Sequence, residues 1–180
     1  MPIQELADGT VVEYNGEGRV VRQRLTDGTV FDRFDGDNRP VHGVVDGQSV
    51  SISYGAGGES TWAFGDGSTL VRSADGDMVR QTTSDGTTFD RFDGDNRPVH
   101  GVVDGQSVSI SYGGNGESTW TYSDGSTLVR NADGDLVRQT TSDGTVFDRF
   151  DGDNRPVHGV VDGQSVSISY GGNGESTWTY

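Results

Sequence analysis

The feature that most constrains this sequence is an internal repeat. The string FDRFDGDNRPVHGVVDGQSVSISYG begins at Phe31 and recurs at Phe89 and Phe147, so the period is 58 residues. We divide the chain into an N-terminal lead-in, residues 1–7, and a single repeat domain, residues 8–180. The domain holds three repeat units, residues 8–65, 66–123 and 124–180. Each unit is expected to bury its apolar face mainly against its neighbours.

A shorter period lies inside each repeat unit. Asp-Gly pairs are spaced 19 or 20 residues apart, so each unit contains three modules of 19–20 residues. The aspartates of these pairs are Asp8, Asp27, Asp46, Asp66, Asp85, Asp104, Asp124, Asp143 and Asp162. Asp-Gly between two alternating runs favours a β-hairpin, because glycine readily takes the positive φ of a type I′ turn. The spacing therefore predicts hairpins along the whole chain.

The runs between the turns alternate with a period of two residues. Val166, Ile168 and Tyr170 are separated by single serines, which is typical of a strand with one buried face. We therefore expect an all-β fold, an antiparallel β-hairpin meander of about eighteen short strands. Because open sheets rarely exceed about ten strands without curling, we expect a curled or spiral repeat sheet. A closed barrel or a three-fold toroid is the alternative.

The composition excludes several classes of protein. The chain has no Cys, which rules out disulfide frameworks and cysteine zinc sites. Its formal net charge of −15 argues against nucleic acid and anionic membranes as partners. No apolar run has the length of a transmembrane helix. The first seven residues lack a signal-peptide pattern; a secreted or cell-surface location, as part of a larger protein, is nevertheless favoured.

A short motif in the turns resembles the YD repeat, Y-D-x-x-G-R-L, of Rhs proteins, insecticidal toxin-complex shells and teneurins. The sequence Tyr14-Asn15-Gly16-Glu17-Gly18-Arg19 is similar to this motif, and so is Phe34-Asp35-Gly36-Asp37-Asn38-Arg39. The second version recurs at residues 92–97 and 150–155. Residues 54–59 keep Tyr and Gly but lose Asp and Arg, and residues 72–77 keep only the Gly. The resemblance covers the repeat segment only.

The resemblance implies a spiral of β-hairpins, which in full-length relatives forms a shell around a toxin. It also implies a non-enzymatic structural role. Our leading interpretation is a scaffold or shell segment of a bacterial surface or toxin-delivery protein. One alternative is a carbohydrate- or calcium-binding adhesion module. A further alternative is an engineered consensus repeat protein, because the repeat units are almost identical.

We expect no cofactor and no metal site, and calcium is the one possibility that the sequence leaves open. Acidic turns place several hard oxygen atoms close together, as calcium requires. The candidate ligands are Asp35, Asp37, Asn38, Asp93, Asp95, Asn96, Asp151, Asp153 and Asn154. Turn hydrogen bonding explains the same residues without a metal. His42, His100 and His158 would meet at a zinc site only in a closed three-fold ring, and we do not expect a metal there.

Aromatic rows are the other candidate binding feature. The candidates are Trp62, Trp120, Trp178, Tyr54, Tyr112 and Tyr170. If exposed, these rings could stack on sugars, whereas burial would make them the core of a sheet short of other apolar residues. The sequence shows no set of nucleophile, base and orienting residue, so we predict no catalytic residues. We also expect self-association through edge strands, because residues 176–180 carry no charge or Pro.

Overall fold

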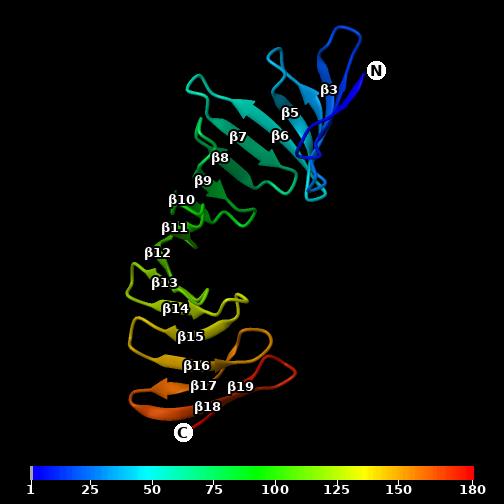
Figure 1. Cartoon of the computed structure of the whole chain (residues 1–180). Helices are drawn as coiled ribbons and strands as arrows, with labels where there is room; N and C mark the ends of the chain where they lie inside the picture. Colours follow the sequence, from blue (N-terminus) through cyan, green and yellow to red (C-terminus); the bar gives the residue numbers. More distant parts are fainter. Residues whose placement is uncertain (1) are drawn as a thin grey trace. The chain divides into compact units, whose positions relative to one another are not determined.

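The computed structural model describes residues 2–180 and contains strands and turns, with no helix in that range. All registers are antiparallel, which confirms the predicted all-β meander. The strands, shown in Figure 1, are β1 (Ile3–Glu5), β2 (Val11–Tyr14), β3 (Val20–Arg24), β4 (Val30–Phe34), β5 (Pro40–Val45), β6 (Gln48–Tyr54), β7 (Ser60–Phe64), β8 (Thr69–Arg72), β9 (Met78–Thr82), β10 (Thr88–Phe92), β11 (Pro98–Val103), β12 (Gln106–Tyr112), β13 (Ser118–Tyr122), β14 (Thr127–Arg130), β15 (Leu136–Thr140), β16 (Val146–Phe150), β17 (Pro156–Val161), β18 (Gln164–Tyr170) and β19 (Ser176–Thr179).

The strand number exceeds the expected eighteen because the lead-in is itself part of the sheet. Ile3 pairs with Glu13 and Glu5 pairs with Val11, so β1 and β2 form a hairpin around the first Asp-Gly turn. Residues 1–7 were expected to precede the repeat rather than to contribute a strand.

Across the described residues, no helix is long and apolar enough to cross a membrane.

The chain divides into two compact parts, and the border in the sequence lies between Asn96 and Arg97. We call residues 2–96 the N-terminal part and residues 97–180 the C-terminal part. This border lies inside the second repeat unit, in the turn before β11, and so it does not follow the sequence repeat. In the N-terminal part, β1 to β10 pair in chain order. In the C-terminal part, β11 to β19 do the same.

The Asp-Gly turns are of two kinds. Asp104 and Gly105 both have positive φ, 50° and 77°, as a type I′ turn requires. Val103 pairs directly with Gln106, which leaves only these two residues in the loop. The type I′ assignment holds for this Asp-Gly pair and its equivalents in the other two repeat units, which begin at positions 46 and 162.

The remaining Asp-Gly pairs form a longer turn, and for them the type I′ assignment is wrong. At Gly28 only the glycine is left-handed, with φ of 91°. The Leu25 N–H donates to the Thr29 carbonyl, and the Gly28 N–H donates to the Leu25 carbonyl. The Asp27 carboxylate accepts the Thr29 N–H at 2.8 Å. This side-chain bond favours a type I turn followed by one left-handed residue.

One face of the sheet is buried and the other is exposed. In the N-terminal part, Phe31, Val50 and Ile52 form the core, and partly buried apolar residues from β4 to β7 pack against them. Val50 is completely buried, and this burial contributes about 1.5–3 kcal/mol to the free energy of folding. The alternating exposure of β6 confirms the predicted period of two residues. In the C-terminal part, Phe147, Val166 and Ile168 form the equivalent cluster.

Gly43 allows β4 and β5 to approach closely. A Cβ atom at this position would lie 2.4 Å from the Val30 carbonyl oxygen and 2.7 Å from the Phe31 ring. Gly43 pairs with Phe31 in the register, so the ring lies over the glycine. Gly159 has the same surroundings in the C-terminal part, where an added Cβ atom would lie 2.4 Å from the Val146 carbonyl oxygen.

Candidate functional site

The motif that resembles a YD repeat forms a bonded unit, which we call the turn brace. Asp35 Oδ1 accepts the N–H groups of Asp37 and Arg39, both at 2.9 Å. Asp35 Oδ2 accepts the Arg39 Nε at 2.8 Å and its Nη2 at 2.7 Å. The Arg39 guanidinium lies 4.4 Å from the centre of the Tyr54 ring, in cation–π geometry. The Tyr54 hydroxyl donates to the Pro40 carbonyl at 2.9 Å.

The brace recurs in the later repeat units. Asp151 accepts from the backbone and the side chain of Arg155, which lies over Tyr170 at 4.6 Å. In the middle unit, Arg97 lies over Tyr112 at 4.5 Å. The sequence predicted that the Asp would form hydrogen bonds within the turn. It did not predict that the Arg would cover the ring of a tyrosine fifteen residues further along the chain.

The brace shifts the acidity of its members. Hydrogen bonding from the Arg39 backbone N–H, with a further contribution from its side chain, lowers the pKa of Asp35. The Asp35 hydrogen bond raises the pKa of Arg39. Burial raises the pKa of Tyr54, and the Asp35 charge adds to this effect. At neutral pH the carboxylate and guanidinium are therefore both charged, which strengthens their mutual hydrogen bonds.

The oxygens proposed for calcium already accept hydrogen bonds from the chain. Asp37 Oδ2 forms an ion pair with Arg39 Nη2 at 3.4 Å, and Asn38 Oδ1 accepts the Val20 N–H at 3.1 Å. In residues 2–180 no group of three or more His, Asp or Glu side chains is placed to hold a metal ion. Calcium binding by the acidic turns stays a prediction, and it would require these hydrogen bonds to be exchanged for metal contacts.

The histidines take part in a polar row on the exposed face of the sheet. Asp32 Oδ1 lies 2.7 Å from His42 Nδ1, and His42 Nε2 lies 3.2 Å from Ser49 Oγ. The three residues come from β4, β5 and β6, which are adjacent strands. A register shift between Phe31 and Arg33 marks Asp32 as the extra residue of a β-bulge, and bulges re-aim side chains.

The same row occurs again in the C-terminal part. Asp148 Oδ1 lies 2.6 Å from His158 Nδ1, and His158 Nε2 lies 3.1 Å from Ser165 Oγ. The hydrogen bond from His158 lowers the pKa of Asp148. His100 Nε2 lies 3.1 Å from Ser107 Oγ. Sequence analysis found no such set of residues. The sequence signal that could have revealed this row is a fixed spacing, with the Asp ten residues before the His and the Ser seven residues after the His.

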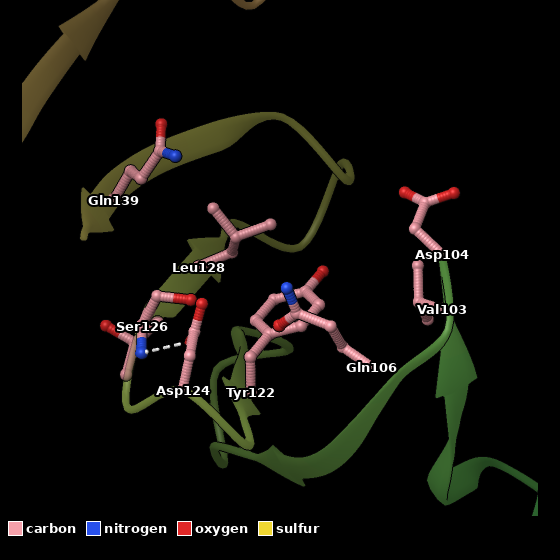
Figure 2. A pocket seen from close by; sticks show the side chains of 9 residues that line it. Val103, Asp104, Gln106, Tyr122, Asp124, Ser126, Leu128 and Gln139 are labelled. Atoms are coloured by element: carbon pink, nitrogen blue, oxygen red, sulfur yellow. Dashed lines mark hydrogen bonds between the residues drawn. The ribbon is translucent and has the colours of Figure 1, made fainter. Parts of the chain in front are cut away.

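A groove on the other face of the sheet is the second candidate site. In the C-terminal part its lining includes Gln106, Tyr122, Asp124, Leu128 and Gln139. Figure 2 shows Tyr122 in the middle of this set, with Asp124 to one side and Gln106 to the other. The hydroxyl and the backbone N–H of Ser126 lower the pKa of Asp124, and the N–H donates to Asp124 at 2.8 Å. This groove therefore presents an aromatic ring beside a charged carboxylate and two amides.

An equivalent groove lies in the N-terminal part. The corresponding lining residues, 58 positions earlier, are Gln48, Phe64, Asp66, Leu70 and Gln81. The main difference is that Phe64 lacks the hydroxyl of Tyr122. Because the groove recurs at equivalent positions of both compact parts, the repeat sequence itself produces it.

Several of the predicted aromatic ligand residues contribute to the core. Trp62 packs edge-on against Phe31, with ring centres 5.9 Å apart and an angle of 74°. Trp178 meets Phe147 in the same way, with ring centres 6.2 Å apart, although the residue is 42% exposed. Tyr54 is covered by the arginine of the brace. Sugar binding by these rings stays a prediction. The groove offers different aromatic residues, Phe64 and Tyr122.

No protein-family model matches the sequence, and a search of curated proteins gives no match. Among solved structures, the G-box domain of the microcephaly protein CPAP is similar over 99% of this chain and 97% of that chain, with 16% identity and a TM-score of 0.37. The TCP10 domain of Danio rerio CPAP matches over 81% and 97%, with 19% identity and a TM-score of 0.27. The same domain in complex with a peptide of Danio rerio STIL matches over 88% and 98%, with 14% identity and a TM-score of 0.26. At these TM-scores the likeness carries no functional argument.

Proposed function

We propose that this chain is a non-enzymatic structural repeat module, a scaffold segment of a bacterial surface or toxin-delivery protein. The observation that carries the proposal is the turn brace. Its Asp, Arg and Tyr bond to one another or to the adjacent backbone. Polar residues that recur at a fixed period and bond within the fold support a mechanical role. The YD-like motif of residues 34–39 supports the same proposal.

The linkage between modules also supports a scaffold. Asn38 Oδ1 accepts a backbone N–H from a residue 18 positions earlier in the chain. Asn96 and Asn154 make the equivalent bonds to Met78 and Leu136, at 2.8 and 3.3 Å. Each asparagine side chain is therefore hydrogen-bonded to the first residue of an earlier strand, β3, β9 or β15. The bond joins the turn that holds the asparagine to the hairpin before it. Such bonds resist separation of neighbouring hairpins.

The test is the rigidity of one compact part. The chain has no Cys, so cysteines introduced at Val102 and Thr177 can carry two spin labels within the C-terminal part. A scaffold is expected to give one narrow distance distribution by pulsed electron spin resonance. Arg155→Ala should broaden the distribution, because it removes the brace. Asp133→Asn, in another acidic turn, is the control, and a broad distribution in the parent chain would contradict the proposal.

A second candidate function is the binding of neutral oligosaccharides in the groove. The specific observation is that the groove recurs at equivalent positions of both compact parts. An aromatic ring can stack on a sugar, while carboxylate and amide groups accept and donate hydrogen bonds to hydroxyls. The charge of Asp124 disfavours anionic sugars.

Titration calorimetry with a panel of neutral and acidic oligosaccharides tests this second candidate. Neutral members should bind, and Gln106→Ala with Gln48→Ala should weaken them about tenfold or more. Ser142→Ala, an exposed turn residue away from both grooves, is the control. Equal heats for the parent and the double variant would exclude the groove as the binding site.

A further inference from the structure

The polar row on the exposed face has the connectivity of an activated serine. A carboxylate beside Nδ1 accepts a hydrogen bond from the N–H group at that position, which leaves Nε2 as the acceptor nitrogen of the neutral imidazole. The Ser49 hydroxyl then donates to His42 Nε2 across their 3.2 Å separation. Nucleophile, base and orienting carboxylate are therefore in hydrogen-bond contact in the order that serine nucleophiles require.

The three members of the row are held by the sheet. The bulge in β4 aims Asp32 at His42, whose side chain is only 24% exposed. The backbone carbonyl of Ser49 accepts the Gly65 N–H at 3.0 Å, which fixes the strand at the nucleophile. Ser49 itself is exposed, so a reagent can reach its hydroxyl. In the row formed by Asp148, His158 and Ser165, the serine is exposed in the same way.

Other serines on the same strands lack this arrangement. Ser51 lies opposite His42 in the β5–β6 register, but it is Ser49 that contacts the imidazole. In the C-terminal part, Ser167 lies opposite His158, and Ser165 makes the contact. Ser51 and Ser167 are also exposed. They are therefore matched internal controls for reactivity.

We propose that Ser49 and Ser165 are acyl-acceptor sites, which take an acyl group from activated esters. As the Oγ–carbon bond forms, the hydroxyl proton moves to Nε2 of the histidine. The bond between the acyl carbon and the leaving oxygen breaks, and the leaving alcohol or phenol takes that proton from Nε2, which restores the neutral imidazole. The product is an O-acyl serine, so the step is a covalent modification of the chain rather than a catalytic cycle. It goes beyond the proposed scaffold role and does not depend on it.

The experiment uses the full chain and p-nitrophenyl acetate, with the modified residues mapped by peptide mass spectrometry. General-base assistance is worth about 10²–10⁴-fold. We therefore expect Ser49 and Ser165 to gain the acetyl group on the order of 100-fold faster than Ser51 and Ser167. Comparable rates at all four serines would overturn the proposal.

Single substitutions in one row leave the other row as an internal control. His42→Gln should reduce acetylation of Ser49 to the rate of Ser51 and leave Ser165 unchanged. Asp32→Asn should lower the Ser49 rate as well, and it provides a second variant if His42→Gln unfolds the N-terminal part. An unchanged Ser49 rate in folded His42→Gln would show that the imidazole is not the base. Acetyl transfer to His42 itself, with nitrophenol release unaffected by Ser49→Ala, would also overturn the assignment.

Discussion

Asn38 Oδ1 lies 3.1 Å from the backbone nitrogen of Val20, while Asn38 itself is left-handed with φ of 60°. Most turns of the chain place glycine in this left-handed position. Here asparagine takes it, because asparagine tolerates the conformation and its side chain can also bridge to a neighbouring turn. One residue therefore satisfies a local backbone requirement and a contact between modules.

Replacement of Asn154 separates these two roles. Asn154→Gly keeps the left-handed backbone but loses the bond to Leu136, so we expect a loss of about 1 kcal/mol. Asn154→Ala loses the bond and also puts a Cβ in the left-handed region, so its loss should be larger by about 1 kcal/mol. Urea unfolding of both variants measures the difference. Equal losses would mean that the backbone conformation contributes little.

A matched pair of glycines tests the type I′ turn. Gly105 has φ of 77° and Gly114 does not have a positive φ, yet a Cβ at either position would meet nothing within 4 Å. Gly105→Ala should therefore cost about 1–2 kcal/mol through backbone strain alone. Gly114→Ala should be neutral or slightly stabilising, because alanine reduces the entropy of the unfolded chain. Thermal unfolding of the two variants provides the measurement, and a reversed order would exclude the turn assignment.

The turn brace predicts a loss of stability in acid. The pKa values of Asp35 and Asp151 are lowered in the folded chain, mainly by hydrogen bonds from the backbone N–H groups of Arg39 and Arg155. A group with a lowered folded pKa contributes stability above its unfolded pKa, about 3.9 for Asp, and loses it as pH falls through the folded value. Urea midpoints should therefore fall steeply below about pH 4.

Removal of one brace carboxylate should flatten this dependence. Asp151→Asn should lower stability at neutral pH and make the acid branch less steep, because one linked titration is gone. Asp133→Asn removes a charge outside the brace and is the control for net charge. If the slopes of Asp151→Asn and the parent chain coincide, the brace is not the source of the acid sensitivity.

Strand β19 is the site where we expect self-association. It pairs with β18, and all four of its residues are exposed. The net charge of −15 opposes contact between chains, and salt screens it with a Debye length of about 8 Å at physiological ionic strength. Sedimentation should show association that increases with concentration and salt and that Thr177→Pro or Thr179→Lys abolishes. Ser142→Lys adds the same charge in a turn and should leave it intact. A monomer under all conditions would contradict the prediction.

The fold was largely predictable because its signals are local and repeated. Alternation in segments such as Gln48–Tyr54 and the periodic Asp-Gly pairs determine strands and turns without long-range information. The turn type was less predictable, because it depends on whether the flanking residues pair directly, as Val103 and Gln106 do. That pairing is a property of the register, and the Asp-Gly letters do not encode it.

The polar rows escaped sequence analysis for a related reason. Asp32, His42 and Ser49 lie on three different strands, and their contact depends on a bulge that moves Asp32 out of simple alternation. Strict alternation would assign each residue of β4 to one face of the sheet by its position alone. It therefore misses the register shift at Asp32. The grooves were missed as well, because Gln106 and Asp124 belong to different hairpins whose spacing only the register sets.

The thin core has a thermodynamic consequence. The buried apolar residues of the described chain are few, with Val50, Val108 and Val166 the largest that are fully enclosed. The heat capacity of unfolding follows the apolar surface that becomes hydrated, about 12–15 cal/mol/K per residue in ordinary globular domains. This chain should lie below that range. Its stability would then change little between cold and warm conditions, and both its heat and its cold unfolding would be gradual.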